Sequence, residues 1–258
     1  MDLDQFYTLP AIAEWLYGVI CEEFDVEKFL LVEPSAGSGA FSSLPRPGCL
    51  GIDLEPRCNG LITADYLGIR IESPLPIITL GNPPFGKNSS LALRFFNHAA
   101  RHSAVIAFVL PRTFRKSKTQ AKLNRYFHLL REVELPRNSF MLEGELRDVP
   151  AVFQIWVRRE VKRPVLKRET THPDFTFVAS ADATVAIQRV GARAGMFHRR
   201  FGMSESSHLF IRASRRVEAR LRRLDLASVA RDTAGCPSVS KSEIVAMYHD
   251  LAGVCRKK

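Results

Sequence analysis

Apolar residues in the first 160 positions fall into two alternating patterns, one typical of helices and one of buried strands. Helical spacing of apolar side chains from Ile12 to Ile20 predicts a helix over Ala11–Phe24, behind an extended arm. Uninterrupted apolar runs that stop at glycine, proline or polar residues predict strands. The runs are Lys28–Glu33, Cys49–Asp53, Pro76–Leu80, Ala104–Leu110 and Ala151–Val157, with Val133–Pro136 as a further candidate strand and a helix over Leu91–Ala100.

Strands that alternate with helices in this way predict an α/β fold built on a parallel sheet. Ligands of such sheets bind at the carboxyl ends of the strands. The pattern changes after the last of these strands, where we expect two helices, one over about Ser214–Leu226 and one after Ser240. Ser240–Glu243 fits a capping box at the start of the second helix. We therefore expect a ligand-binding domain over residues 1–160 and a smaller region over residues 161–258.

The smaller region is strongly basic, with lysine and arginine gathered in Arg158–Arg168 and continuing to Arg200. The whole chain carries 37 Lys and Arg against 27 Asp and Glu, a net charge of +10. Because these side chains neutralise phosphates, we expect a nucleic-acid partner. No apolar run approaches the roughly 18 residues of a membrane span. The five cysteines are odd in number and widely spaced, so we expect a cytoplasmic protein with reduced thiols and no metal site.

A glycine-rich turn follows the first predicted strand. Gly37 and Gly39 would let the backbone approach a ligand closely, and the helix start after them would favour a negatively charged group. Asp53 ends the second predicted strand, twenty residues after Glu33, where a carboxylate can accept hydrogen bonds from both hydroxyls of a ribose. The two features together indicate a nucleotide-like cofactor.

A second turn, Gly81–Gly86, follows the strand over Pro76–Leu80 and contains the tetrapeptide Asn82–Phe85. An amine attached to an aromatic ring is a poor nucleophile because its lone pair is delocalised into the ring. The Asn82 side-chain oxygen and the Pro83 carbonyl could accept both amine hydrogens and favour a more tetrahedral nitrogen. Phe85 could stack on a base extruded from a nucleic-acid helix. This turn therefore indicates a site that activates an exocyclic amine as a nucleophile.

These motifs resemble those of S-adenosylmethionine-dependent N6-adenine DNA methyltransferases in which the cofactor motif precedes the catalytic motif and target recognition comes last. The family's catalytic tetrapeptide matches Asn82–Phe85, and Asp4–Thr8 resembles the N-terminal arm that packs over the methionine part of the cofactor. The resemblance covers roughly residues 1–157 and leaves out the C-terminal hundred. The family's cofactor loop matches at Glu33, Pro34, Gly37, Gly39 and Phe41.

The resemblance implies a Rossmann-like class I methyltransferase sheet with helices on both faces, and S-adenosylmethionine as cofactor. A small basic C-terminal subdomain would recognise the target DNA. By the same resemblance, Asp53 holds the ribose, and Asp65 and Tyr66 border the cofactor adenine. The implied cofactor-binding residues are Phe6, Tyr7, Thr8, Glu33, Pro34, Gly37, Gly39, Asp53, Leu54, Asp65 and Tyr66, and the implied catalytic residues are Asn82, Pro83, Pro84 and Phe85.

Further residues are candidate contacts to the target nucleic acid. Phe140 lies in a segment similar to the late strand pair where an aromatic side chain can face the target base, although a core position is an equally good interpretation. Basic side chains near the predicted active-site edge and in the C-terminal region would bind phosphates. We select Arg112, Lys116, Arg199 and Arg200.

Four alternatives stay open. The same tetrapeptide serves N6-adenine methyltransferases that act on RNA, and a related site methylates the N5 of glutamine in proteins. A catalytically silent nucleic-acid-binding module is a third alternative. A dinucleotide-dependent oxidoreductase is a fourth, although Ser42 occupies the third glycine position of its fingerprint. The sequence leaves the oligomeric state open, a dimer included.

Overall fold

The computed structural model describes residues 6–44, 48–164, 168–233 and 235–255. The chain divides into two units, Met1–Val165 and Leu166–Lys258, and each is described by itself. The main elements of the first unit are β1 (Tyr7–Thr8), α1 (Pro10–Glu23), β2 (Leu30–Pro34), β3 (Cys49–Asp53), β4 (Ile62–Thr63), β5 (Ile77–Gly81), α2 (Ser90–Ala99), β6 (Val105–Pro111), α3 (Ser117–Gln120), β7 (Phe127–Glu134), β8 (Phe140–Leu142), β9 (Glu145–Arg147) and β10 (Ala151–Arg158). Its short 3-10 helices are η1 (Val26–Lys28), η2 (Tyr66–Gly68), η3 (Lys87–Ser89) and η4 (Arg112–Arg115).

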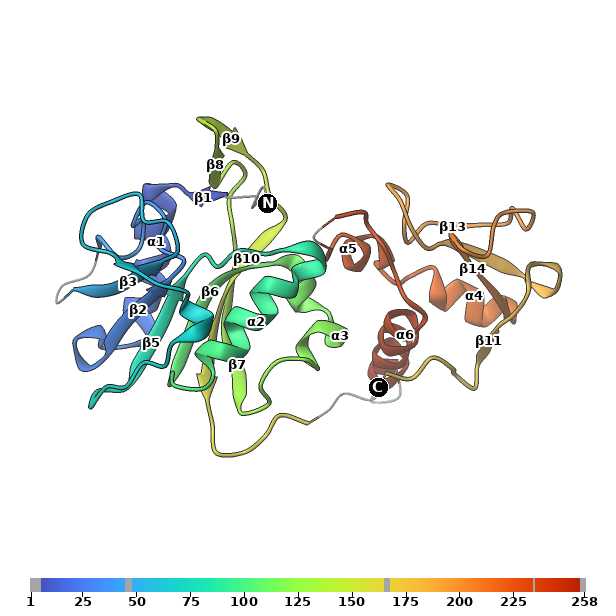
Figure 1. Ribbon diagram of the computed structural model, residues 1–258. Helices are drawn as coiled ribbons and strands as arrows, with labels where there is room; N and C mark the ends of the chain where they lie inside the picture. The colour runs from blue at the N-terminus through green and yellow to red at the C-terminus, as the bar shows by residue number, and fades with distance from the viewer. Residues whose placement is uncertain (1–5, 45–47, 165–167, 234, 256–258) are drawn as a thin grey trace. The chain divides into compact units, whose positions relative to one another are not determined.

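A seven-stranded sheet in the order β4-β3-β2-β5-β6-β10-β7 forms the centre of the first unit (Figure 1). The five strands from β4 to β6 run parallel, in line with the sequence prediction. At the other edge, β10 runs antiparallel to both β6 and β7. An antiparallel edge on a parallel sheet is common in α/β folds. It does not disturb the carboxyl ends of the parallel strands.

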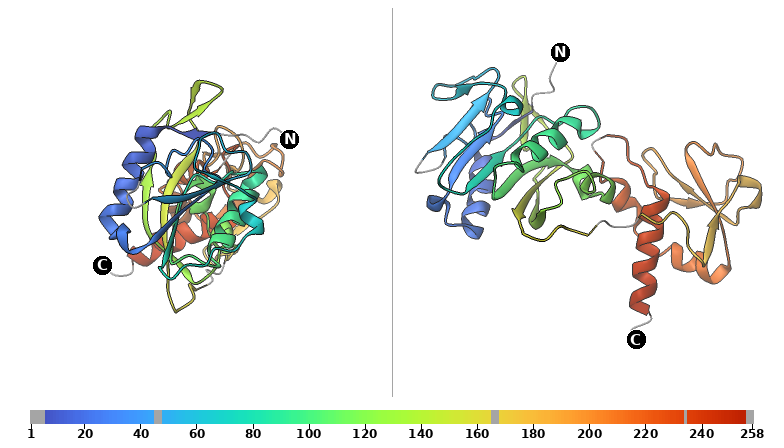
Figure 2. Two further views of the ribbon diagram at one scale, coloured as in Figure 1. Left: turned by 60° about the vertical axis from the view of Figure 1, so that its left-hand side comes forward. Right: turned by 60° about the horizontal axis from the view of Figure 1, so that its bottom comes forward.

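Successive residues of a strand point to opposite faces of the sheet, so a strand with consecutive apolar residues makes both faces apolar. Helices cover both faces (Figure 2). On β2, Leu31 packs into the core shared with α1, whereas Val32 packs into the core shared with α2. Leu16 of α1 and Phe96 of α2 are fully buried in these two cores. The predicted α/β sheet with helices on both faces is therefore confirmed.

The second unit is built on a four-stranded antiparallel sheet, in the order β11-β14-β12-β13, that the sequence analysis did not predict. Helices α4, α5 and α6 share its core through Leu221, Leu226 and Tyr248. The elements are β11 (Phe175–Phe177), η5 (Ser180–Asp182), β12 (Val185–Gln188), β13 (Phe197–His198), β14 (His208–Ala213), α4 (Arg215–Leu221), α5 (Leu226–Ala230) and α6 (Lys241–Cys255).

The predicted C-terminal helices are present, with one correction. The helix expected over Ser214–Leu226 ends early, at Leu221, and a separate helix, α5, begins at Leu226. Asp225 caps the start of α5 by accepting the Ser228 N–H at 3.0 Å. The capping box before α6 is confirmed. The Ser240 N–H donates to Glu243 Oε2 at 2.7 Å, and the Glu243 N–H donates to Ser240 Oγ at 3.3 Å.

Candidate active site

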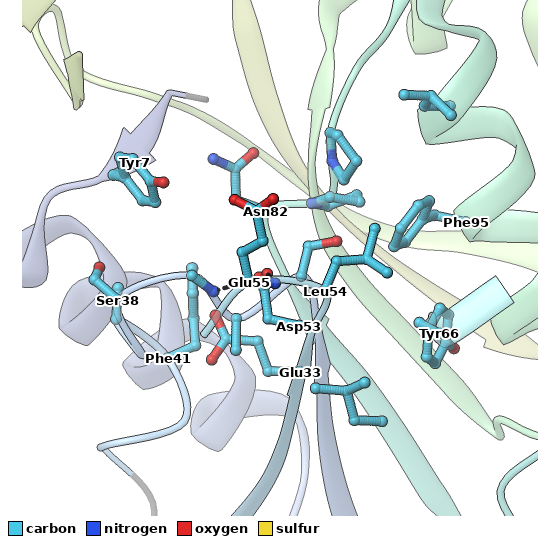
Figure 3. A pocket seen from close by; sticks show the side chains of 18 of the residues that line it. Tyr7, Glu33, Ser38, Phe41, Asp53, Leu54, Glu55, Tyr66, Asn82 and Phe95 are labelled. Carbon is cyan, nitrogen blue, oxygen red and sulfur yellow. Dashed lines mark hydrogen bonds between the residues drawn. The ribbon is translucent and has the colours of Figure 1, made fainter. Parts of the chain in front are cut away.

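A cavity of about 350 Å³ lies at the carboxyl ends of β2, β3, β4 and β5, where the fold predicts a ligand site. Its volume falls within the ~300–1,000 Å³ usual for small-molecule sites. Figure 3 shows Tyr7 on one side of the cavity, Tyr66 and Phe95 on the opposite side, and Asn82 between them. Most of the predicted cofactor and catalytic residues line it: Phe6, Tyr7, Thr8, Glu33, Gly37, Asp53, Leu54, Asp65, Tyr66, Asn82, Pro83, Pro84 and Phe85.

The glycine-rich turn packs directly against the N-terminal arm. Gly37 has a φ of 54°, and a Cβ added to it would lie 2.8 Å from Tyr7 Cε1, so this position requires glycine. The Arg57 guanidinium lies 4.9 Å from the centre of the Tyr7 ring, which places the ring between the turn and a cation. Next to it, the buried Thr8 Oγ1 has no hydrogen-bond partner among the described residues. The arm thus presents an unsatisfied polar atom where a ligand would bind.

Glu33 closes the inner side of the turn. Its carboxylate accepts the Ser42 N–H at 2.6 Å, which holds the turn onto the end of β2. Burial raises the pKa of Glu33 to about 8. Gly81, at the end of β5, has a φ of 130°, and a Cβ there would lie 3.0 Å from Glu33 Cγ. The two strand ends therefore approach closely because β5 ends in glycine.

Asp53 lies at the end of β3 with its carboxylate fixed by two backbone amides. Oδ2 accepts the Gly37 N–H at 2.7 Å, and Oδ1 accepts the Glu55 N–H at 2.8 Å. A carboxylate has about four acceptor sites, so two remain for a ligand. This geometry fits the predicted hydrogen bonds to a pair of ribose hydroxyls.

The far end of the cavity is formed by the segment after β4. Asp65 caps η2 by accepting the Leu67 N–H at 3.0 Å. Tyr66 is only 2% exposed, stacks on Phe95 with ring centres 5.6 Å apart, and its hydroxyl lies 3.0 Å from His102 Nε2. Burial raises the pKa of the Tyr66 hydroxyl. Tyr66 therefore forms a rigid wall suited to a flat ring.

The tetrapeptide Asn82–Phe85 follows β5 directly. The Asn82 side-chain amide donates to the Phe6 carbonyl at 2.8 Å, so the N-terminal arm fixes the orientation of this side chain. With the NH₂ group engaged, Oδ1 serves as the acceptor. Phe85 is partly buried against both cores, and its carbonyl accepts the N–H groups of Leu91 at 3.1 Å and Ala92 at 3.3 Å. The tetrapeptide is thus anchored at both ends.

Pro34, Gly39 and Phe140 do not line the cavity, and neither do the four predicted basic residues. Pro34 is the last residue of β2. Gly39 has a φ of 78°, and a Cβ added to it would lie 2.8 Å from Cys58 Sγ, so Gly39 packs against Cys58. The placement of Phe140 does not support its expected contact with a target base. Phe140 is 1% exposed and pairs with Thr8 of β1 inside the core that includes Phe153.

The four predicted basic contacts differ in their surroundings. Arg112 pairs with Glu134 at 3.2 Å. Arg199 donates to both oxygens of Glu218 at 3.1 Å, and Glu218 also pairs with Arg222 at 2.8 Å. Lys116 lies between η4 and α3, and Arg200 is exposed. Arg112 and Arg199 therefore already have carboxylate partners within the fold.

The sequence analysis missed the contribution of α2. Leu91 and Phe95 lie four residues apart on one helix face, and both line the cavity beside Arg94. Among the described residues, Arg94 is the only cationic side chain that lines the cavity. The apolar spacing after Asn82–Phe85 was a signal for this helix face, but it did not indicate which side of the helix meets the ligand.

No protein-family model matches the chain, and no curated protein matches it in sequence. Several solved structures resemble it. A Pyrococcus horikoshii protein assigned to the RNA methyltransferases is 16% identical over 60% of this chain and 87% of its own, with a TM-score of 0.49. The 23S rRNA methyltransferase ErmE is 13% identical over 95% of this chain and 99% of its own, with a TM-score of 0.40.

Magnesium protoporphyrin IX methyltransferase from Synechocystis PCC 6803, solved with bound S-adenosylmethionine, is 12% identical over 58% of this chain and 78% of its own, with a TM-score of 0.41. At these identities and TM-scores, the similar structures do not indicate an activity for this chain. The fold assignment rests on the chain's own strand order. A mostly parallel seven-stranded sheet with an antiparallel strand near one edge and helices on both faces is the Rossmann-like class I methyltransferase architecture predicted from the sequence.

The described residues contain no group of three or more His, Cys, Asp or Glu side chains that could hold a metal ion. In the same part of the chain, no helix has both the length and the apolar character needed to cross a membrane.

Proposed function

We propose that this chain is an S-adenosylmethionine-dependent methyltransferase that methylates the N6 amine of adenine in DNA. The observation that carries this proposal is the placement of Asn82. Its side chain lines the cavity at the end of β5, and its NH₂ group is held by the Phe6 carbonyl at 2.8 Å, which leaves Oδ1 as a fixed acceptor. A fixed acceptor next to a proline carbonyl suits an amine with two hydrogens to donate.

The residues of the cavity fit the cofactor. Asp53, Glu55 and Asp65 give it acceptors for ribose hydroxyls and for a cationic ligand, and the buried Thr8 Oγ1, which has no hydrogen-bond partner among the described residues, adds a further polar atom. The Tyr66 and Phe95 rings offer an apolar wall for an adenine. When bound, S-adenosylmethionine supplies a methyl group activated by a sulfonium.

The chain's own residues would act by positioning the substrate and by electrostatics. Asn82 Oδ1 and the Pro83 carbonyl would accept the two hydrogens of the amine and increase the electron density on its nitrogen. Phe85 lines the cavity and would stack on the base. No cysteine nucleophile is needed, since the amine itself attacks.

The distribution of charge supports a nucleic-acid substrate. Residues 166–258 contain 17 Lys and Arg against 9 Asp and Glu, a net charge of +8, whereas residues 1–165 contain 20 against 18, a net charge of +2. Almost all of the excess positive charge thus belongs to the second unit, which lies outside the cofactor fold. Such a concentration is typical of a phosphate-binding region.

The test is methyl transfer to several substrates in parallel. Labelled S-adenosylmethionine is incubated with duplex DNA, single-stranded DNA, total RNA and unfolded protein, and the products are digested and identified by mass. N6-methyladenine in DNA is the expected result. The same base in RNA alone would replace DNA with RNA as the substrate, and methylglutamine would overturn the nucleic-acid proposal.

A further inference from the structure

The turn between the catalytic tetrapeptide and α2 is conformationally strained. Asn88 has φ 55° and ψ 33°, and Ser89 has φ 62° and ψ 22°, so two successive residues other than glycine adopt the left-handed conformation. Asparagine tolerates this region better than serine does. Such backbone persists only where surrounding contacts enforce it, and it gathers at functional sites.

A half-buried side-chain hydrogen bond helps to hold this turn. Ser89 is 1% exposed, and its Oγ lies 2.7 Å from Thr113 Oγ1. Thr113 belongs to η4, which directly follows β6, the sheet neighbour of β5. The next residue of η4, Phe114, is fully buried and packs against Phe96 of α2. The threonine hydroxyl is therefore presented from a firmly packed segment.

The turn is linked to the tetrapeptide by backbone hydrogen bonds. The Phe85 carbonyl accepts the N–H groups of Leu91 and Ala92 in the first turn of α2, and the Gly86 carbonyl accepts the Ser89 N–H at 3.1 Å. A change of the Ser89 backbone would consequently move the start of α2 and, with it, the Phe85 carbonyl that binds this start.

We infer that the Ser89–Thr113 hydrogen bond is a positioning contact for catalysis, which holds the strained turn so that Asn82 and the Pro83 carbonyl meet the target amine correctly. The inference rests on the proposed methyltransferase function. It assigns roles to two hydroxyls that touch neither cofactor nor substrate. Because a misplacement of about 1 Å costs on the order of a hundredfold in rate, removal of a hydroxyl should act on kcat.

Thr113→Val removes the hydroxyl and keeps the shape of the side chain. We expect kcat for methyl transfer to fall about ten- to a hundredfold, while the Kd for S-adenosylmethionine, measured by calorimetry, stays within twofold. The separate variant Thr113→Ser keeps a hydroxyl at this position, so its kcat should stay near that of the wild type. A merely structural role would weaken cofactor binding and the melting temperature together with kcat.

A second pair of variants tests the strain itself and does not depend on Thr113→Val. Ser89→Ala loses the hydrogen bond and keeps the backbone strain, whereas Ser89→Gly loses the hydrogen bond and removes the strain. We expect kcat of Ser89→Gly to exceed that of Ser89→Ala severalfold.

The outcomes separate this inference from the proposed function. If the wild-type protein transfers no methyl group to any substrate, the proposed function fails and the inference falls with it. If the wild-type protein is active but Thr113→Val keeps its kcat, or Ser89→Ala matches Ser89→Gly, the function stands and the positioning role is refuted. If Thr113→Val does not fold, the comparison of the two Ser89 variants decides the question.

Discussion

Three polar side chains of the cavity are fixed by backbone groups from other segments of the chain. Asn82 is held by the Phe6 carbonyl, Asp53 by the Gly37 N–H, and Glu33 by the Ser42 N–H. Each bond sets the orientation of an acceptor before any ligand arrives. Such preorganisation lowers the cost of ordering these groups during the reaction.

The role of Asn82 predicts a clean separation of catalysis from cofactor binding. Asn82→Ala removes the acceptor, so kcat should fall at least a hundredfold, in the range of about 10²–10³ seen when a single preorganised polar group is removed. The Kd for S-adenosylmethionine should change less than threefold. Pro83→Ala should act in the same direction, by loosening the carbonyl. Loss of cofactor affinity in both variants would mean that this turn is structural.

Gly37 makes a prediction about cofactor affinity. Alanine there would have a left-handed backbone, which costs about 1–2 kcal/mol, and its Cβ would collide with the Tyr7 ring. We expect the affinity for S-adenosylmethionine to fall about tenfold or more. Gly18→Ala is the matched control, because Gly18 lies inside α1 with nothing within 4 Å of an added Cβ. Equal affinities in the two variants would refute the close packing of arm and turn.

Glu33 predicts a pH dependence of stability. Its pKa rises from 4.5 when unfolded to about 8 when folded, so the folded state binds more protons and the free energy of unfolding should decrease as pH rises between these values. Burial lowers the pKa of His102 to about 4 and also lowers the pKa of His98 and His198, which favours the folded state as pH rises, but this effect is complete by about pH 7.5, one unit above the unfolded pKa.

The window from about pH 7.5 to 8 therefore isolates Glu33. Urea unfolding of the cofactor-free protein should show stability decreasing across this window, and Glu33→Gln should flatten the decrease. A wild-type curve that is flat there, or a slope that Glu33→Gln leaves unchanged, would contradict the neutral Glu33 that burial implies.

At the scale of elements, the carboxyl ends of four parallel strands bring together segments far apart in sequence. Continuous apolar runs predicted β2, β3, β5, β6 and β10, because buried strands leave a strong signal in the sequence. The antiparallel direction of β10 depends on tertiary pairing with β6, which no local pattern carries.

The sheet of the second unit left no comparable signal. Its strands span only two to six residues, too short for a clear alternation of apolar and polar positions. Similarly, Phe140 was as typical of a core residue as of a base contact, and only its pairing with Thr8 distinguishes the two. Conversely, the cavity residues were predictable because the motifs fall at strand ends, where an α/β sheet binds its ligands.

Helix α4 gives a prediction at this scale. Arg215, Arg216 and Arg223 are exposed on or directly after it, and within the described residues none of them forms an ion pair. Their combined change to glutamine should weaken DNA binding and reduce the slope of log K against log salt by up to about 0.9 for each phosphate that is no longer neutralised. Filter binding at several salt concentrations measures both quantities.

The control removes the same number of charges from the first unit. Arg101, Lys122 and Arg137 are also exposed and form no ion pair within the described part of the chain, and their combined change to glutamine should leave the salt slope within error. A similar loss of affinity in both triple variants would show that DNA binding follows total charge and not this helix.

At the scale of the whole molecule, the chain separates two tasks between its units. The first unit holds the cavity and carries a net charge of only +2, while the second carries +8 and lies outside the cofactor fold. Under the proposed function, cofactor chemistry and polyanion binding would occupy different parts of the chain. A protein with this division is expected to lose nucleic-acid affinity with salt while cofactor affinity changes little.

The central claim is that the N6 nitrogen of adenine receives the methyl group. The most direct measurement uses duplex DNA whose adenine amines carry ¹⁵N and S-adenosylmethionine whose methyl group carries ¹³C, with the product nucleosides analysed by mass fragmentation and NMR. We predict a direct ¹³C–¹⁵N coupling in N6-methyldeoxyadenosine, and loss of this product in Asn82→Ala. Methylation of a ring nitrogen, of another base or of no DNA base at all would contradict the account.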